Sequence, residues 1–318
     1  MSEDGIRMSG FRRPVVFITG RSDNPYTYYF PIWANSISEE MTMEKKQIIA
    51  IAAVVVVIVA AVGIALAMNN GGNSGKKINS VDDLSGATIG VASGYTGQSL
   101  TLSDIEGGAL SKDTVVRPYE SGAAAVSALK EGHVDCVIID EQPAKKLVEA
   151  NSGLKILDTN FAVEDYAIAV KKDNKALLDK VNGALAEIKG DGTLEKIIKY
   201  YEDGVGEKYV REDTDYTGGK LNMITEAYFP PYEYFNDNGD GTIVGMDVDI
   251  MQAIASKLKM ELVVKSMDFN ALIGQIQVSD ESENYVIAAG MTVTDERKAN
   301  VDFTDPYKTS VQVIITKA

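Results

Sequence analysis

The chain has 318 residues, enough for one to three domains, and 45% of them are apolar, which is ample for a buried core. Its 31 basic and 46 acidic residues give a net charge of -15, which disfavours binding to the phosphates of nucleic acids. The only cysteine, Cys136, excludes an intrachain disulfide and a thiolate zinc cluster, and we expect it to be buried and inert. The only histidine, His133, is expected at a solvated helix end, so we predict no catalytic triad, metal site or cofactor.

Residues 1–43 show no interpretable periodicity, and we expect an extension that is disordered or wrongly included in the sequence. Ile48–Met68 is an uninterrupted apolar run that spans about 30 Å as a helix, so we predict a transmembrane anchor within residues 44–69. The lysines before it place the rest of the chain outside the cell. Ala65-Leu66-Ala67 fits a signal cleavage pattern, so secretion after cleavage is the alternative.

A Gly/Asn/Lys spacer at residues 70–77 leads into a first predicted lobe, residues 78–165. Buried strands alternate there with helices, a pattern that indicates a largely parallel sheet. The expected strands are 88–92 and 134–140, and the expected helices are 121–130 and 142–150.

Residues 166–171 alternate apolar with small side chains, and we expect this segment to return the chain to a second lobe, residues 166–318. Its elements follow the same periodicity arguments. We predict helices within 173–202, at 248–258 and at 270–277, and strands at 221–224, 261–266, 285–289 and 311–316. A two-lobed α/β protein follows.

A carboxylate site is predicted directly after the strand that ends at Ala289. The backbone of Gly290, the hydroxyl of Thr292 and the guanidinium of Arg297 lie within eight residues, and arginine offers the planar pair of donors that a carboxylate matches. Ligands of open α/β sheets bind beyond the carboxyl ends of strands. The alternative is a solvated loop on which Arg297 pairs with Asp295, Glu296 or Asp302.

The stretch Ala289–Arg297, closed by Val301–Tyr307, resembles the signature of extracellular solute-binding proteins of family 3, which capture polar amino acids for ABC importers on a type II periplasmic-binding fold. Residues 221–318 resemble the first half of that family, with Phe229–Tyr234 and Val244–Ile250. Residues 78–202 resemble its second half, with Asp83–Gly86, Val134–Asp140, Asp191–Leu194 and Lys199–Tyr201.

The reversed order of the two halves predicts a circular permutation, with the region from Glu202 to Lys220 joining the old termini. The lobe-1 unit then comprises residues 173–202 and 218–318. We place the cut at the hinge, so that one of two crossover strands is interrupted and the hinge is softened. A truncated tandem array, whose half-chains swap between molecules, is the alternative.

The resemblance also implies a set of ligand-binding residues. Gly290, Thr292 and Arg297 would hold the α-carboxylate from one lobe. Gly94, Tyr95 and Thr96 would reach the same group from the other lobe, although the family usually has a small hydroxyl residue at position 95, and a plain β-turn is the alternative. Asp140 would bind the α-ammonium, or else cap the next helix. Phe229 and Phe269 would form aromatic walls, and Glu226 would contact a polar side chain, cationic or amide.

We therefore expect an extracytoplasmic protein, not an enzyme, that closes on a free polar amino acid and presents it to an ABC transporter permease. The alternatives are an amino-acid-sensing receptor ectodomain and, less favoured, a dehydratase on the same fold. Asn236–Gly241 comes near a calcium-binding loop, but its flanks favour a β-hairpin turn.

Overall fold

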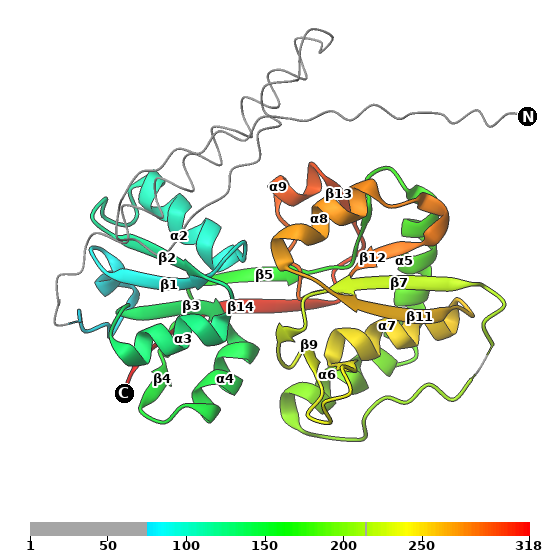
Figure 1. The fold of residues 1–318 in the computed structure, drawn as a ribbon, viewed down its shortest axis with the longest axis horizontal. Helices are drawn as coiled ribbons and strands as arrows, with labels where there is room; N and C mark the ends of the chain where they lie inside the picture. The colour runs from blue at the N-terminus through cyan, green and yellow to red at the C-terminus, as the bar shows by residue number, and fades with distance from the viewer. Residues whose placement is uncertain (1–74, 214) are drawn as a thin grey trace, which may run out of the picture. The chain divides into compact units, whose positions relative to one another are not determined.

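Two sheets, each covered by helices on both faces, make up the two lobes of the computed structural model (Figure 1). The structure describes residues 75–213 and 215–318. The predicted extension, the apolar run and most of the spacer lie outside the described residues. Within the described part of the chain, no helix is both long and apolar enough to cross a bilayer.

The first lobe contains a mixed sheet. Strand β1 runs parallel to β2 and β3, as the alternating pattern predicts, but β14 runs antiparallel to β3, β4 and β5. The strand order of this sheet is β2-β1-β3-β14-β4, and β5 pairs with β14. Strand β3 is buried along its whole length, and Ser121 caps α3 by accepting a hydrogen bond from the Ala124 amide. The elements are η2 (Val81–Leu84), β1 (Thr88–Ala92), α2 (Thr96–Gly107), β2 (Val115–Tyr119), α3 (Gly122–Glu131), β3 (Cys136–Asp140), α4 (Glu141–Ala150), β4 (Leu154–Ile156) and β5 (Ala162–Tyr166).

The second lobe is built on the sheet β11-β7-β12-β6-β13, with a small sheet β10-β9-β8 beside it. Helices α5, α6 and α7 pack together, as the apolar spacing of the two earlier helices predicts. The elements are β6 (Ala169–Lys171), α5 (Lys175–Gly190), α6 (Thr193–Asp203), β7 (Lys220–Thr225), β8 (Tyr228–Phe229), β9 (Glu233–Phe235), β10 (Ile243–Val244), α7 (Met246–Lys257), β11 (Glu261–Ser266), α8 (Phe269–Val278), η3 (Glu281–Glu283), β12 (Tyr285–Ile287), α9 (Asp295–Lys298) and β13 (Val301–Phe303). The last strand, β14 (Lys308–Lys317), belongs to the first-lobe sheet.

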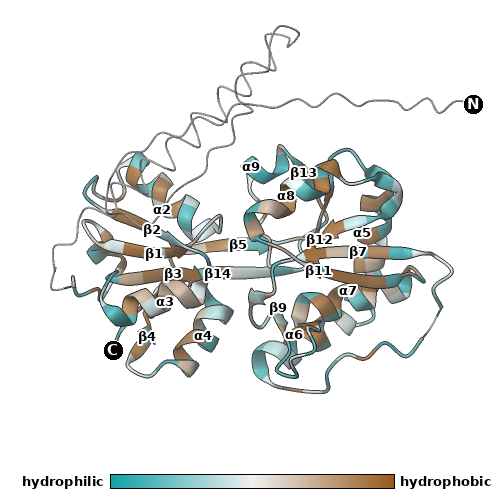
Figure 2. Ribbon diagram, viewed as in Figure 1, coloured by the Kyte–Doolittle hydropathy of each residue, from teal (hydrophilic) through white to brown (hydrophobic). Residues whose placement is uncertain are grey.

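Hydrophobic side chains gather along the central strands of both sheets, while the outer helix surfaces and loops are mostly hydrophilic (Figure 2). Strand β3 in the first lobe is buried along its whole length, and four of the six residues of β7 in the second lobe are buried. One hydrophobic cluster includes residues of both sheets, such as Ile139 of β3 and Met223 of β7, and a second cluster lies in the first lobe, with Ile138.

Two antiparallel strands connect the lobes. Strand β5 leads from the first lobe into β6 of the second, and β14 returns beside it to pair with β3 and β4 of the first-lobe sheet (Figure 1). The prediction that residues 311–316 form a strand of the second lobe, with the hinge cut after it, is therefore wrong. Alternation of apolar residues identifies a strand without saying which sheet receives it, and the softened hinge loses its basis.

Several local predictions are confirmed. Cys136 is buried in β3, and His133 is exposed just after α3, beside Glu131. Residues 236–242 close a hairpin between β9 and β10, with the Asn236 amide donating to the Thr242 carbonyl. Each lobe is completed by strands from both parts of the same chain, so swapping between molecules is not needed to close either sheet.

Candidate functional site

Buried hydrogen bonds hold the segment from Gly290 to Arg297 in place at the carboxyl end of β12. The Gly290 amide donates to the Asp247 carboxylate at 2.8 Å, and the Tyr307 hydroxyl donates to the same group, also at 2.8 Å. Burial raises the pKa of Asp247 to about 6, while these donors oppose the shift. A Cβ at Gly290, whose φ is +50°, would lie 2.6 Å from the ring of Phe229, so only glycine fits there.

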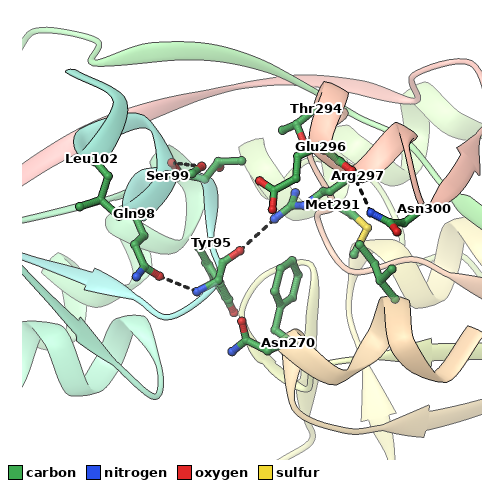
Figure 3. Close-up of a pocket in the computed structure, with 14 residues that line it drawn as sticks. Tyr95, Gln98, Ser99, Leu102, Asn270, Met291, Thr294, Glu296, Arg297 and Asn300 are labelled. Carbon is green, nitrogen blue, oxygen red and sulfur yellow. Dashed lines mark hydrogen bonds between the residues drawn. The ribbon is translucent and has the colours of Figure 1, made fainter. Parts of the chain in front are cut away.

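Arg297 connects the two lobes. Its Nη1 donates to the Thr292 carbonyl at 2.9 Å. Its Nη2 donates to the Gly94 carbonyl of the first lobe at 3.0 Å (Figure 3). Its guanidinium carbon lies 5.2 Å from the ring centre of Phe269, a cation–π distance. Burial lowers the pKa of Arg297, against the pull of nearby Glu164 and Asp140. Among the described residues Arg297 forms no salt bridge, so the ion-paired loop expected as the alternative is not found.

Asp140 ends β3 inside the protein, with only 3% of its surface exposed. It accepts a hydrogen bond from the Tyr166 hydroxyl, and its side chain does not cap α4. Burial raises the pKa of Asp140 to about 8, and the neighbouring Glu164 carboxylate adds to the shift. The alternative role of a helix N-cap is thus not observed. A protonated acid at this position loses its proton readily once a cation approaches.

Sequence reasoning missed two residues beside Asp140. Gln312 of β14 donates to Glu164 of β5 at 2.9 Å and to Thr96 at 3.3 Å. Thr292 donates to the same Glu164 oxygen at 3.2 Å, and its hydroxyl lies 3.4 Å from that of Thr96 across the lobes. Glu164 lies two residues before Tyr166 in a strand, which places both side chains on one face. This two-residue spacing is the signal in the sequence that places Glu164 on the same face as Tyr166.

Aromatic side chains surround the remaining space. Phe229 and Phe269 are both buried in the second lobe, and Phe229 stacks on Tyr232 with 5.4 Å between the ring centres. Tyr95 enters from the first lobe, with its ring centre 5.2 Å from that of Phe229 and 4.7 Å from that of Phe269. Its hydroxyl donates to Glu226, whose pKa is raised by burial. Ser93 and Gly94 form a turn, closed by the Tyr95 amide donating to the Ala92 carbonyl, and Thr96 and Gly97 already belong to α2.

The predicted residues meet at one small cavity. Its lining comprises Tyr95, Thr96 and Asp140 of the first lobe, and Phe229, Phe269, Ala289, Gly290, Thr292 and Arg297 of the second. The cavity volume is about 10 Å³, room for about one water molecule and far less than an amino acid needs. Gly94 and Glu226 lie just outside this lining. The lobes are therefore closed, and a ligand requires them to part.

A larger cavity of about 310 Å³ lies on the other side of Arg297 and Tyr95, between α2 of the first lobe and α8 and α9 of the second (Figure 3). Its lining is mixed, with polar side chains such as Gln98 and Asn300 beside apolar ones such as Leu102 and Ile273. The residues that border both cavities, and so separate them, are Tyr95, Thr96, Phe269 and Arg297.

The profile described as bacterial extracellular solute-binding proteins, family 3, matches residues 95–203 and 221–318. The chain belongs to this family. The two-lobed α/β fold agrees with membership of this family of solute-binding proteins. Among the described residues of this solute-binding protein, no cluster of three acidic, His or Cys side chains is placed to hold a metal ion.

Curated relatives of this solute-binding protein include an arginine-binding extracellular protein, ArtP, of Bacillus subtilis (strain 168), 42% identical over 98 residues, which are 31% of this chain and 36% of that protein. The L-cystine-binding protein TcyJ of Escherichia coli (strain K12) is 31% identical over 127 residues, 40% of this chain and 45% of that one. The chain thus spans less than half the length of these relatives. Among solved structures, the arginine-bound form of domain 1 from TmArgBP is 36% identical, with a TM-score of 0.26, over 31% of this chain and 80% of that one.

Proposed function

We propose that the protein binds a free polar amino acid between its two lobes, outside the cytoplasm, and delivers it to the permease of an ABC importer. The single observation that carries the proposal is that Arg297 and Asp140 line the same cavity from opposite lobes. A guanidinium from one lobe and a buried acid from the other, lining one small space, suit the carboxylate and the ammonium of a zwitterion.

On the carboxylate side, the two donors of Arg297 now point at the carbonyls of Thr292 and Gly94. A ligand carboxylate would replace these two neutral acceptors with one anionic group that can accept both donors in a bidentate pair. The Thr96 and Thr292 hydroxyls lie beside the guanidinium and would donate to the same group.

On the ammonium side, Asp140 holds a proton below pH of about 8, because its carboxylate is buried beside Glu164. A ligand ammonium would supply the missing positive charge, so Asp140 would release its proton as the ligand binds. Glu226 at the aromatic end of the pocket favours a cationic or amide side chain.

Closure about β5 and β14 would bring both poles of the site onto the ligand, because each lobe holds half of the contacts. Both connecting strands are intact, so the hinge is a matched antiparallel pair. The permease would recognise the closed form. Attachment to the membrane through the apolar run before residue 69 would keep the binder near it.

We also propose that the chain is a circular permutant, in which residues 204–219 join α6 to β7. Support comes from the family profile, which matches two blocks on either side of this linker. A rearranged chain with residues 220–318 placed before residues 78–203 is expected to fold and to bind with the same affinity, because both crossover strands remain intact. A loss of the two-lobed fold in the rearranged chain would contradict this proposal.

The test of the binding function is native mass spectrometry of the full chain together with a thermal-shift screen of the twenty amino acids. We expect at least one polar amino acid to bind unchanged and to raise the Tm, and Arg297→Gln to abolish that rise. Arg117→Gln is the matched control, since Arg117 donates to a surface carbonyl in the first lobe. Absence of any shift, or an equal loss in both variants, would refute the proposal. A chemically converted amino acid would indicate an enzyme.

A further inference from the structure

Tyr95 is an aromatic residue of the first lobe that lines the cavity between the lobes. Its backbone forms the N-cap of α2, yet its ring inserts between Phe229 and Phe269 of the second lobe. Only 8% of its surface is exposed. The side chain therefore spans the boundary between the lobes.

The polar end of Tyr95 is also satisfied by the second lobe. Its hydroxyl donates to Glu226, which is itself only 4% exposed. Burial and the Glu226 charge raise the pKa of Tyr95 well above its ordinary value, so the phenol remains a neutral donor. The Tyr95 phenol thus places a planar group between two aromatic walls and aims a donor at a buried carboxylate. A long cationic side chain of a ligand would make the same contacts there.

The ring leaves little space beside it. The cavity that Tyr95 shares with Asp140 and Arg297 has a volume of about 10 Å³, whereas the cavity on its other side has about 310 Å³. Tyr95 borders both, so the larger cavity is where the ring would go if it left the aromatic pair.

We propose that the Tyr95 side chain is an internal occupant of the compartment that receives the ligand's side chain, and that it sets specificity by competing with long cationic groups. This inference rests on the proposed function, because it takes the ligand's charged ends to lie at Arg297 and Asp140. A ligand with a long cationic side chain must displace the phenol from Glu226, while a small side chain leaves the phenol in place.

The first test asks whether the compartment has the shape of a phenol, independently of amino-acid binding. The probe is p-cresol, which has the shape of the tyrosine side chain, and it is added to the full chain with and without the substitution Tyr95→Ala. We expect millimolar p-cresol to raise the Tm of this variant and not that of the wild type, because a buried cavity binds the group whose shape it has lost. Tyr228→Ala is the matched control, since Tyr228 is exposed. Equal effects of p-cresol on all three proteins would overturn the proposal.

The second test measures competition, with L-arginine as the probe. Tyr95→Ala is expected to bind L-arginine at least tenfold more tightly than the wild type. Adding Glu226→Gln to the Tyr95→Ala variant is expected to remove most of that gain in affinity. Tyr95→Phe keeps the ring but removes the hydroxyl that occupies Glu226, so its affinity for L-arginine is expected to rise about threefold. This variant replaces Tyr95→Ala in the test if the alanine variant fails to fold. Unchanged or weaker arginine binding in both Tyr95 variants would overturn the proposal. Selective p-cresol binding with no amino-acid binding at all would support the placement of Tyr95 and refute the proposed function.

Discussion

Replacement of Asp140 by asparagine separates the stability of the ligand-free protein from its proposed function. Asparagine keeps an oxygen that accepts the Tyr166 hydroxyl, so the shape and this hydrogen bond are retained. What the substitution removes is the ionisation of a buried acid. The ligand-free protein should therefore become more stable at neutral pH, while binding of a ligand ammonium should become weaker.

The size and sign follow from the pKa of Asp140, which burial raises from 3.8 to about 8 in the folded protein. Between these values the folded protein holds a proton that the unfolded chain releases, so the free energy of unfolding falls as pH rises. Each pH unit costs about 1.4 kcal/mol, which gives an upper limit of about 4 kcal/mol at pH 7. When the cleft opens, water hydrates the Asp140 carboxylate, so the actual loss of unfolding free energy at pH 7 is smaller than this limit.

Urea denaturation of the wild type and of Asp140→Asn, followed at several pH values, measures this difference. We expect equal stabilities near pH 4 and a variant that is more stable by at least about 1 kcal/mol at pH 7. Asp191→Asn is a control for which the free energy of unfolding at neutral pH should change in the opposite direction. Hydrogen bonds from Lys257 and Thr193 hold the pKa of Asp191 below its ordinary value, so its loss should weaken the protein at neutral pH.

The reasoning would be refuted if Asp140→Asn were less stable than the wild type at pH 7, or if the difference did not grow between pH 4 and pH 7. Either outcome would show that the folded protein pays no net cost for the buried acid. The Asp140 carboxylate would then be ionised in the closed form, and a ligand ammonium would not be needed to neutralise it.

Three further outcomes are expected. Arg297→Lys should weaken amino-acid binding at least tenfold in calorimetry, because an ammonium cannot make the two parallel hydrogen bonds of a guanidinium; retained affinity would place the carboxylate elsewhere. Calorimetry of amino-acid binding at pH 6.5 in buffers of different ionisation enthalpy should show release of about one proton per ligand from Asp140; no release would contradict its protonated state. Gly290→Ala should lower the free energy of unfolding by about 1–3 kcal/mol, because its Cβ meets Phe229 and its φ is positive; Gly183→Ala, in an open position on α5, should be neutral or stabilising.

Strongly periodic elements could be predicted from the sequence almost to the residue. Strands β1 and β11 begin and end where expected, because each is a short run rich in β-branched and apolar residues. Helix α2 was not predicted. Its buried residues are Thr96, Gly97 and Thr101, so the helix packs through small polar side chains and carries no apolar stripe to detect.

The candidate site divides in the same way. A motif in one segment identified Arg297 and its neighbours, because the donors of a carboxylate site are close in sequence. The position of the Tyr95 ring depends on Phe229 and Glu226, more than 130 residues away, and nothing local to position 95 predicts it. The lobe to which β14 belongs was missed for a similar reason, since strand pairing is a tertiary choice.

The most direct measurement of the central claim compares a bound amino acid with the same molecule lacking one charge. Calorimetry with the ligand found by mass spectrometry, its α-carboxamide and its N-acetyl derivative isolates the contact at each lobe. If Arg297 holds the carboxylate and Asp140 the ammonium, each derivative should bind at least tenfold more weakly, and the two losses should shrink in Arg297→Gln and Asp140→Asn respectively. If either derivative binds as tightly as the parent amino acid, the two lobes do not grip the two ends of a zwitterion.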